Sequence, residues 1–463
     1  MKNRDLIYVS PRWFGALVLL FVVSAFFFSC QREEGYYKVS VLTQPYTGGG
    51  KVTLDDDRYA CWTDGDEVWV NGQVCAMSVQ GSSATMSVPA SGDLRAVYPA
   101  FHVSEVSGEV TMSLPQVQKY RLSGDRQLVE APMAAYASQG SGTITFSNLC
   151  SLLMLTNIPS GWDVQFVTVK NGGVTAICGS GTVNFSGGQP SLSALSDGRD
   201  SVVLDCRQNY NSANTVYIVI PPVAYSNLTV HVYVKEDGVM KRYEAVGTHS
   251  GTFQPNTIYQ FTLPSAPTLQ PASFTPVGAI SGLFTVGADG HKVWFSQGNL
   301  QYKDSEKKWR FAGNPSDICS SNNRYAQEGY NGWIDLFGWG TSGWSSGAVC
   351  YQPYCTVKNN SSYYPGGLPS NNLVGNYANA DWGVYNAIEN GGGTRGLWRT
   401  LTSAEWDYLL TGAGREGRCA VGVVENVYVL VLLPDNMSIP DNFNSGETNA
   451  DNNDFTSVWS LWQ

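Results

Sequence analysis

The chain has 463 residues, with 28 Lys and Arg against 38 Asp and Glu, and a formal net charge of −10. Charged residues make up 14% and aromatic residues 12% of it, a balance that excludes an intrinsically disordered protein and a coiled coil. The acidic balance gives no electrostatic surface for nucleic acid, so no nucleic-acid partner is expected. What remains is a large β-rich protein of extracellular type, long enough for two or three domains.

Residues 1–30 are predicted to be a lipoprotein signal peptide. A basic start precedes an apolar run from Phe14 to Phe28, which is too short and too near the terminus for a spanning helix. The following Ser29-Cys30 completes a resemblance to the lipobox of bacterial lipoproteins, so Cys30 is the expected lipidation site. Residues 31–34 resemble an acidic signal for export to the outer face of the outer membrane. An ordinary cleaved signal or an uncleaved anchor is the alternative.

The nine other cysteines are sparse and odd in number, so at least one thiol stays free or pairs between chains. A local bridge between Cys350 and Cys355 and a set of buried free thiols are both open. No Cys-x-x-Cys motif occurs and the chain has only four His, so no metal site is expected.

Residues 31–263 read as many short strands with frequent turns. Residues 228–234 alternate aliphatic with other side chains, a period of two that predicts a strand buried on one face, and residues 163–169 and 215–220 are similar. Residue pairs that favour two-residue hairpins occur at Asn71-Gly72, Asn171-Gly172 and Asp237-Gly238. This pattern of short strands separated by tight turns predicts a β-sandwich region.

Residues 264–276 are rich in Pro and are predicted to be a stiff linker. Residues 277–463 then form a second region, richer in Trp, Gly and Asn. A hairpin is expected over residues 293–302, with its turn near Gln297-Gly298.

Two helices are expected in this second region. Thr402 and Glu405 have the spacing of a capping box, and the helix that they begin is expected to end at Gly412. A second short helix carries Trp382 and Tyr385. The region is therefore predicted to be α+β with long irregular loops.

No catalytic constellation is recognisable, so the chain is predicted to be neither an enzyme nor a cofactor-binding protein. The four histidines lie in separate strand or loop contexts, without a nucleophile motif around them: His102, His231, His249 and His291.

Acidic and amide residues near the carboxyl end could supply oxygen ligands to calcium. They occur at residues 435–436, 441–442 and 449–454, but without the spacing of a known calcium loop, so a solvated loop is favoured.

The second region is dense in aromatic residues, which either stack against sugar rings or fill a loop-rich core. Most are expected in the core, and three are proposed to contact a ligand: Trp339, Trp344 and Trp382.

The first region resembles the fimbrillin-like family, subunits of the surface fimbriae of anaerobic Gram-negative bacteria. The segments that carry the resemblance are residues 62–66, 97–100, 131–135, 146–153 and 219–222. The resemblance implies a pair of linked transthyretin-like β-sandwiches.

The second region resembles a domain group related to C-type lectins and formylglycine-generating enzymes, through residues 293–302, 309–311, 333–342 and 398–406. It implies an α+β lectin-like domain, which is truncated or lacks its last strands, since the usual Trp-Ser-Ser-type strand does not follow. The formylglycine-generating activity needs a cysteine pair where only Cys419 occurs.

Together these resemblances imply a lipid-anchored fimbrial accessory or tip subunit on the outer membrane, with an adhesive head for a surface glycan or protein. In the fimbrillin family, proteolysis removes the first strand and a neighbour's segment replaces it. Here residues 36–42 are the candidate removable strand and Arg58 the candidate cleavage point, so the first sandwich is expected to close incompletely by itself. The alternatives are a non-polymerising surface glycan-binding lipoprotein and a scaffold with an inert second region.

Overall fold

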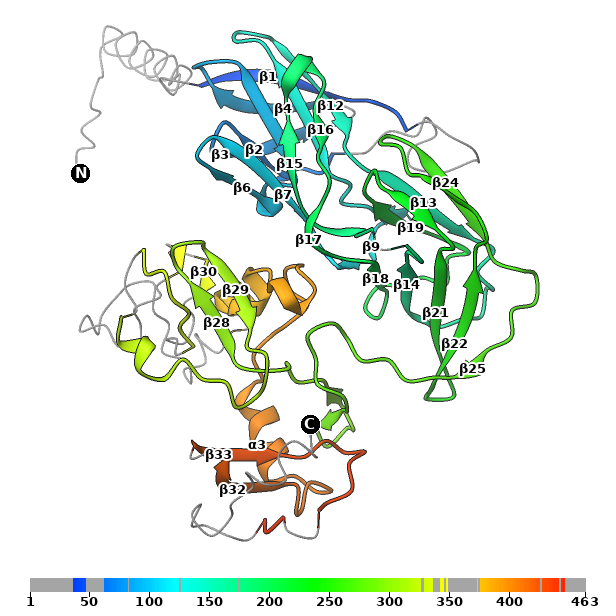
Figure 1. Cartoon of the computed structure of the whole chain (residues 1–463), viewed down its shortest axis with the longest axis vertical. Coiled ribbons are helices and arrows are strands. Elements are labelled where there is room, and N and C mark those ends of the chain that lie inside the picture. Colours follow the sequence, from blue (N-terminus) through cyan, green and yellow to red (C-terminus); the bar gives the residue numbers. More distant parts are fainter. Residues whose placement is uncertain are drawn as a thin grey trace, which may run out of the picture.

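The computed structural model describes residues 36–46, 62–81, 83–124, 126–173, 175–325, 329–335, 342–344, 347–348, 373, 375–424, 427–440 and 443–445. The described chain is mainly β, as the sequence predicts. In Figure 1 two β bodies form the amino-terminal half, and the carboxy-terminal region lies beside them. The predicted signal peptide, residues 1–30, lies outside the described residues.

The first body is a closed barrel. Its strands, in spatial order, are β1 (Tyr36–Thr43), β12 (Thr143–Asn148), β11 (Met133–Ala137), β5 (Leu94–Tyr98), β2 (Glu67–Val70), β3 (Gln73–Gln80) and β4 (Ser83–Pro89). Alternate side chains of these strands fill its core, among them Val39, Met86 and Phe146. Asn71 and Gly72, with φ of 48° and 86°, form the predicted tight turn between β2 and β3.

The second body is a sandwich of two sheets that share one apolar core. The smaller sheet has the order β19 (Thr215–Ile220), β13 (Ser151–Thr156) and β24 (Ile258–Thr262). The larger has the order β25 (Gln270–Pro271), β22 (Val239–Val246), β21 (Thr229–Glu236), β14 (Val164–Lys170), β18 (Ser201–Asp205) and β8 (Val117–Lys119). The strands predicted from periodicity correspond to β14, β19 and β21. Asp237-Gly238 is the predicted turn between β21 and β22.

A further sheet lies between the two bodies. It contains β16 (Ser191–Leu192), β15 (Cys178–Asn184), β7 (Glu109–Leu114) and β6 (Val103–Val106), with β17 (Ser196–Arg199) also paired to β15. Short pairs are β9 (Arg121–Ser123) with β10 (Arg126–Leu128), and β20 (Ala224–Ser226) with β23 (Ser250–Thr252). One apolar cluster joins Val97 of the barrel, Met112 of this sheet and Leu152 of the sandwich. The barrel and the sandwich therefore share buried packing.

The predicted hairpin turn at Asn171-Gly172 is wrong. Asn171 is fully buried, and its side-chain amide donates to the carbonyl of Ala224 at 3.0 Å and accepts from the Ser226 amide at 3.1 Å. The same residue pair that predicts a turn serves here to hold two loops together, because an Asn side chain can also satisfy buried backbone groups.

The Pro-rich segment packs against the sandwich along part of its length. β25 pairs with β22, and the Phe274 ring stacks on Phe166 with centroids 3.9 Å apart. The segment predicted to be a stiff linker is thus partly a surface layer of the second body.

The carboxy-terminal region is built from short strand pairs and short helices. The pairs are β26 (Phe284–Thr285) with β27 (Lys292–Val293), β28 (Leu300–Lys303) with β29 (Lys308–Phe311), β30 (Ser342–Gly343) with β31 (Gly347–Ala348), and β32 (Cys419–Val424) with β33 (Val427–Leu432). The α-helices among the described residues there are α2 (Trp382–Tyr385) and α3 (Ser403–Thr411). The 3₁₀ turns in the described part of the chain are η1 (Ala100–His102), η2 (Ser186–Gly188), η3 (Ser320–Tyr325), η4 (Gly375–Ala380) and η5 (Glu389–Gly391).

The hairpin predicted over residues 293–302 is wrong, because each of its two strands has a nearer partner. β27 pairs with β26, and β28 with β29. Gly298 does not make a turn between them. It lies where a Cβ atom would approach the carbonyl oxygens of Ala312 and Asn314 to 2.7 Å, so the glycine permits a close backbone contact.

The two predicted helices are confirmed. Thr402 accepts from the Glu405 amide at 3.2 Å, and the Glu405 carboxylate accepts from the Thr402 amide at 2.8 Å. Helix α3 ends at Gly412, as expected, and α2 contains Trp382 and Tyr385. None of the helices in the described part of the chain is long and apolar enough to cross a membrane.

Glu405, the acidic residue of the capping box, should make helix α3 sensitive to acid. Hydrogen bonding from Arg399 lowers the pKa of Glu405 from 4.5 to about 2, so its ionised form stabilises the folded state. That contribution is complete above pH 4.5 and is lost as the pH falls toward 2. We expect Glu405→Gln to reduce the hydrogen-exchange protection of α3 by about 1 to 2 kcal/mol at neutral pH, and progressively less in acid. Asp407→Asn, on the exposed side of the helix, is the control; a pH-independent difference for Glu405→Gln would contradict the assignment.

Candidate functional site

Strand β1, drawn in blue in Figure 1, lies in the wall of the barrel between β4 and β12. It pairs antiparallel with β4 at six register positions and parallel with β12 at four. Because both of its edges are hydrogen-bonded, β1 closes the barrel, and neither β4 nor β12 presents a free edge along this stretch.

The side chains of β1 alternate between the core and the solvent. Val39 and Val41 are 1% and 5% exposed and face Met86 and Ala84 across the β1–β4 ladder. Leu42, the next residue, is 54% exposed. The strand therefore contributes both backbone hydrogen bonds and two buried aliphatic side chains to closure.

In the uncut chain β1 closes the first body. Incomplete closure of this body without β1 stays a prediction. The covalent connection from β1 to the rest of the barrel runs through residues 44–66. Residues 47–61 of this connection, with the candidate cleavage point Arg58, lie outside the described residues. On the far side of it, the Trp62 ring packs edge-on against Tyr98 and Phe146, with centroids 5.0 and 5.2 Å apart.

β1 also lies in line with β24, the last strand in the chain of the smaller sheet of the sandwich. β12 and β13 follow each other closely in the chain; β1 pairs parallel with the first and β24 parallel with the second. Asn256 connects the two, since its side chain donates to the Pro45 carbonyl at 2.8 Å and accepts from Asn148 at 2.6 Å. β1 and β24 therefore occupy successive parts of one path that crosses both bodies.

Tyr46 ends the described part of this path and anchors it. Its side chain is 3% exposed and belongs to the cluster between the two bodies, with Trp69 and Leu149. Its hydroxyl is buried without a hydrogen-bond partner in the described structure, and burial raises the pKa of the phenol well above its usual range. Sequence reasoning ended the strand at residue 42 and missed this residue, although an aromatic residue directly after Pro45 was a visible signal.

Three of the residues singled out in the sequence lie outside the described part of the chain: Cys30, Arg58 and Trp339. Trp344 is half-buried, with its ring edge-on to Tyr377 and centroids 6.3 Å apart. Trp382, also half-buried, packs against the cluster that contains Tyr302 and Trp309. Trp382 thus contributes to core packing, as most aromatics of this region were expected to do.

The candidate calcium ligand Asp435 is already engaged. Its carboxylate accepts from the Thr285 hydroxyl at 2.7 Å and from Arg415 at 2.8 Å, and lies 3.2 Å from the Lys292 ammonium. The Asp435 carboxylate connects the β26–β27 pair with the segment that follows α3, and is not part of a solvated loop. Residues 441–442 and 449–454 lie outside the described residues, and within those described no group of three His, Cys, Asp or Glu could hold a metal.

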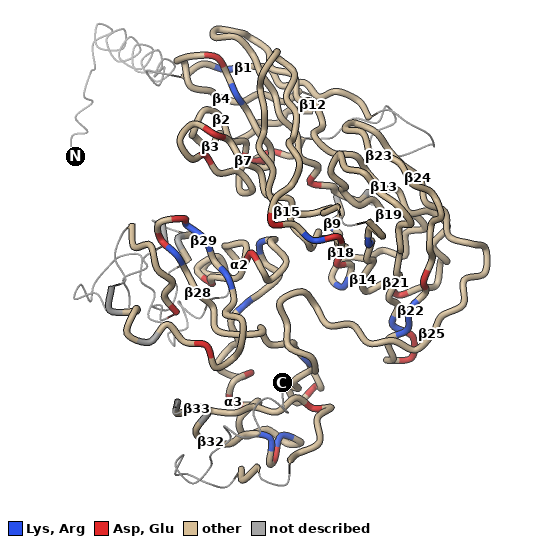
Figure 2. Tube along the Cα trace, in the orientation of Figure 1, with Lys and Arg blue, Asp and Glu red and all other residues tan. Residues whose placement is uncertain are grey.

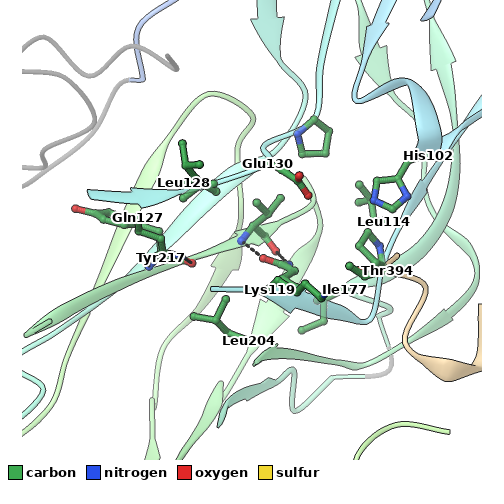
Figure 3. A pocket seen from close by; sticks show the side chains of 15 residues that line it. His102, Leu114, Lys119, Gln127, Leu128, Glu130, Ile177, Leu204, Tyr217 and Thr394 are labelled. Atoms are coloured by element: carbon green, nitrogen blue, oxygen red, sulfur yellow. Dashed lines mark hydrogen bonds between the residues drawn. The ribbon is translucent and has the colours of Figure 1, made fainter. Parts of the chain in front are cut away.

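Figure 3 looks into a pocket lined by His102, Lys119, Glu130 and Tyr217 among others, with Thr394 of the carboxy-terminal region at its wall. Its volume is about 40 Å³, enough for water but not for a substrate. Burial lowers the pKa of His102 to about 3 and raises that of Glu130, which pairs with Arg121.

The described cysteines are all unpaired: Cys75, Cys150, Cys178, Cys206, Cys319 and Cys419. The first four are buried, and burial raises the pKa of each of their thiols. They fill space as small apolar groups. Cys350 and Cys355 lie outside the described residues.

No protein-family model and no curated protein sequence matches the chain. Solved structures resemble about half of it. A candidate cell adhesion protein from Bacteroides ovatus is 15% identical with a TM-score of 0.33, covering 52% of this chain and 97% of that one. One from Bacteroides fragilis is 12% identical with a TM-score of 0.27, covering 52% and 99%. The tip fimbrial protein Mfa3 from Porphyromonas gingivalis, truncated at its C-terminus, is 11% identical with a TM-score of 0.23, covering 51% and 99%.

Because the buried hydroxyl of Tyr46 has no hydrogen-bond partner among the described residues, its removal is expected to stabilise the protein. We expect Tyr46→Phe to raise the free energy of unfolding by about 1 kcal/mol, because it removes a buried donor that has no acceptor. Tyr120→Phe is the matched control: Tyr120 is equally buried, but its hydroxyl donates to Asn211 at 2.8 Å, so its loss should destabilise. Chemical denaturation measures both, and a destabilising Tyr46→Phe would show that its hydroxyl is satisfied in solution.

Proposed function

We propose that this protein is a cell-surface adhesion protein of the fimbrial type that joins its neighbours by exchange of strand β1. The observation that carries the proposal is the position of β1 in the barrel wall. β1 is hydrogen-bonded on both edges and closes the barrel, yet a single segment that contains Arg58 connects it to the remaining strands. Cleavage at Arg58 would leave β1 held by non-covalent contacts alone.

Loss of β1 would expose two strand edges and an apolar groove. The six register positions on β4 and the four on β12 would lose their partner, and the pockets of Val39 and Val41 would open to water. Such a surface is unstable until another extended segment supplies the same hydrogen bonds and side chains. A strand from a second molecule is the natural occupant.

The geometry specifies what an incoming strand must provide. It must run parallel to β12, place small aliphatic side chains at the positions of Val39 and Val41, and lie against Asn256 where β1 now passes toward β24. A bulky side chain five residues beyond Val41 would fill the volume of Tyr46.

The order of the sequence features agrees with this assembly route. The expected lipid-bearing residue, Cys30, precedes β1, so the uncut chain would be tethered at the outer membrane through the same segment that closes the barrel. Cleavage at Arg58 would exchange this tether for a contact with a neighbouring subunit.

A tip or accessory position is part of the proposal. The sandwich is followed by residues 277–463, so the place from which a fimbrial subunit would donate a strand is continued by another region. A subunit that accepts a strand but does not donate one caps a polymer. The adhesive role then falls to the carboxy-terminal region, where Trp339 and Trp344 remain candidate ligand contacts.

Peptide exchange tests the proposal. The chain from residue 31 would be cut with an arginine-specific protease, warmed, and mixed with a labelled peptide of residues 36–46. We expect stable incorporation after cleavage at Arg58, and none in the Arg58→Gln chain. A peptide with Val39→Asp should fail, because the charge would enter the barrel core, whereas one with Leu42→Asp, at an exposed position, should still bind.

Mass spectrometry under native conditions measures the incorporation. If the completely cleaved chain keeps its own fragment and takes up neither the unmodified peptide nor the Leu42→Asp peptide, strand exchange is excluded. The non-polymerising surface-binding protein would then be the better interpretation.

A further inference from the structure

The outward face of the larger sheet of the sandwich is apolar in its middle and charged at one end. Val117 and Val203 are cross-strand partners on β8 and β18, and Lys119 and Asp205 are the partners two residues further on, so the two pairs lie on one face. Phe166 on the next strand is the partner of Asp205 and joins this apolar surface.

The carboxy-terminal region covers part of this face. The Gly392 carbonyl accepts from the Val117 amide at 2.9 Å, and the Gly396 carbonyl accepts from the Lys119 ammonium at 2.7 Å. Between these contacts and the ring of Trp294 lies a cleft of about 510 Å³. This volume is in the range of small-molecule sites, which are mostly apolar with a few convergent polar groups.

Basic side chains dominate the charged lining of the cleft. It contains four cations and a single carboxylate, in a chain whose net charge is −10. Figure 2 shows basic positions near β9, β14 and α2. Lys292, Arg207 and Arg399 each have a carboxylate partner within 3.2 Å. Lys119 is half-buried and, within the described residues, has none at ion-pair distance.

Arg207 is held rigidly with donors to spare. Its Nε and one Nη bond both oxygens of Asp205, at 3.0 and 2.7 Å, so that this carboxylate is fully paired. The guanidinium lies over the rings of Phe166 and Trp294, 4.9 and 5.4 Å from their centroids. A guanidinium has five N–H donors, and its planar fork matches a carboxylate. The side chain is 32% exposed, so unused donors can meet a ligand.

The aromatic wall suits a ring with both apolar and hydroxyl-bearing sides. Trp294 and Trp398 are half-buried in the lining. The indole of Trp398 donates to the Gly391 carbonyl at 2.7 Å, whereas that of Trp294 has no acceptor among the described residues. An indole face packs against the C–H face of a pyranose, and a free indole N–H can donate to a sugar hydroxyl.

We infer that this cleft binds a carboxylated sugar, with the ligand carboxylate beside Lys119 and Arg207 and the sugar ring against Trp294. Uronic acids and sialic acids share this chemistry. The site is separate from strand exchange, because no residue of β1 lines the cleft, and it differs from the tryptophans that the sequence suggested.

Calorimetric titration of the uncut chain from residue 31 tests the inference, with glucuronic acid and N-acetylneuraminic acid as separate probes and glucose and benzoate as neutral and non-sugar controls. We expect binding of at least one acid sugar at millimolar concentration or below, and weaker binding of glucose and benzoate. The acid sugar that binds identifies the source of the ligand.

Charge variants then locate the site. Lys119→Gln should weaken binding by about tenfold or more, because it removes a charge-assisted hydrogen bond, and Lys119→Arg should restore part of it. Lys170→Gln, on the same sheet but outside the cleft, is the matched control and should leave the affinity unchanged. Thermal unfolding of each variant verifies folding.

Three results would overturn the inference: no binding of either acid sugar, equal binding of glucose or benzoate, or an equal loss in Lys119→Gln and Lys170→Gln. Because the chain stays uncut, none of these depends on whether β1 can be exchanged.

Discussion

The backbone hydrogen bonds that β1 makes on both of its edges are the constraint on which the amino-terminal half depends. A barrel strand cannot leave without exposing two rows of amide and carbonyl groups, and those groups need a partner. Val39 and Val41 add apolar burial to the same requirement, and Tyr46 extends it into the cluster that joins the barrel to the sandwich. One segment of the chain thus closes the first body and connects it to the second.

A single covalent connection, from β1 to β2, decides whether β1 is an intramolecular strand of the barrel. In the uncut chain, β1 is an intramolecular strand, and its local concentration keeps the barrel closed. We propose that a cut in the connection at residues 47–61 makes the same contacts exchangeable, so that a strand from another molecule can take the place of β1 beside β12, in line with β24. The carboxy-terminal region contacts a different face, through Gly392 and Gly396, so the cleft and the surface around β1 are separate parts of the molecule.

Local signals in the sequence predicted the elements whose structure is decided locally. Period-two strands and the Asn71-Gly72 turn were correct, as was the capping box of Thr402 and Glu405, because neighbouring residues determine each. Asn171-Gly172 failed because a buried Asn satisfied distant backbone groups. The closing role of β1, the burial of Tyr46 and the position of Lys119 opposite Asp205 on neighbouring strands depend on long-range register. A single sequence does not encode this register in any local pattern.

Hydrogen exchange on the barrel strands tests the central claim most directly. In a chain cleaved at Arg58 and stripped of its amino-terminal fragment under mild denaturant, the amides of β4 and β12 that now bond to β1 should lose protection, while β14 and β21 in the sandwich keep theirs. Restored protection on adding back the fragment would complete the account. Unchanged protection of β4 and β12 after the fragment has left would contradict it, since the barrel would then close without β1.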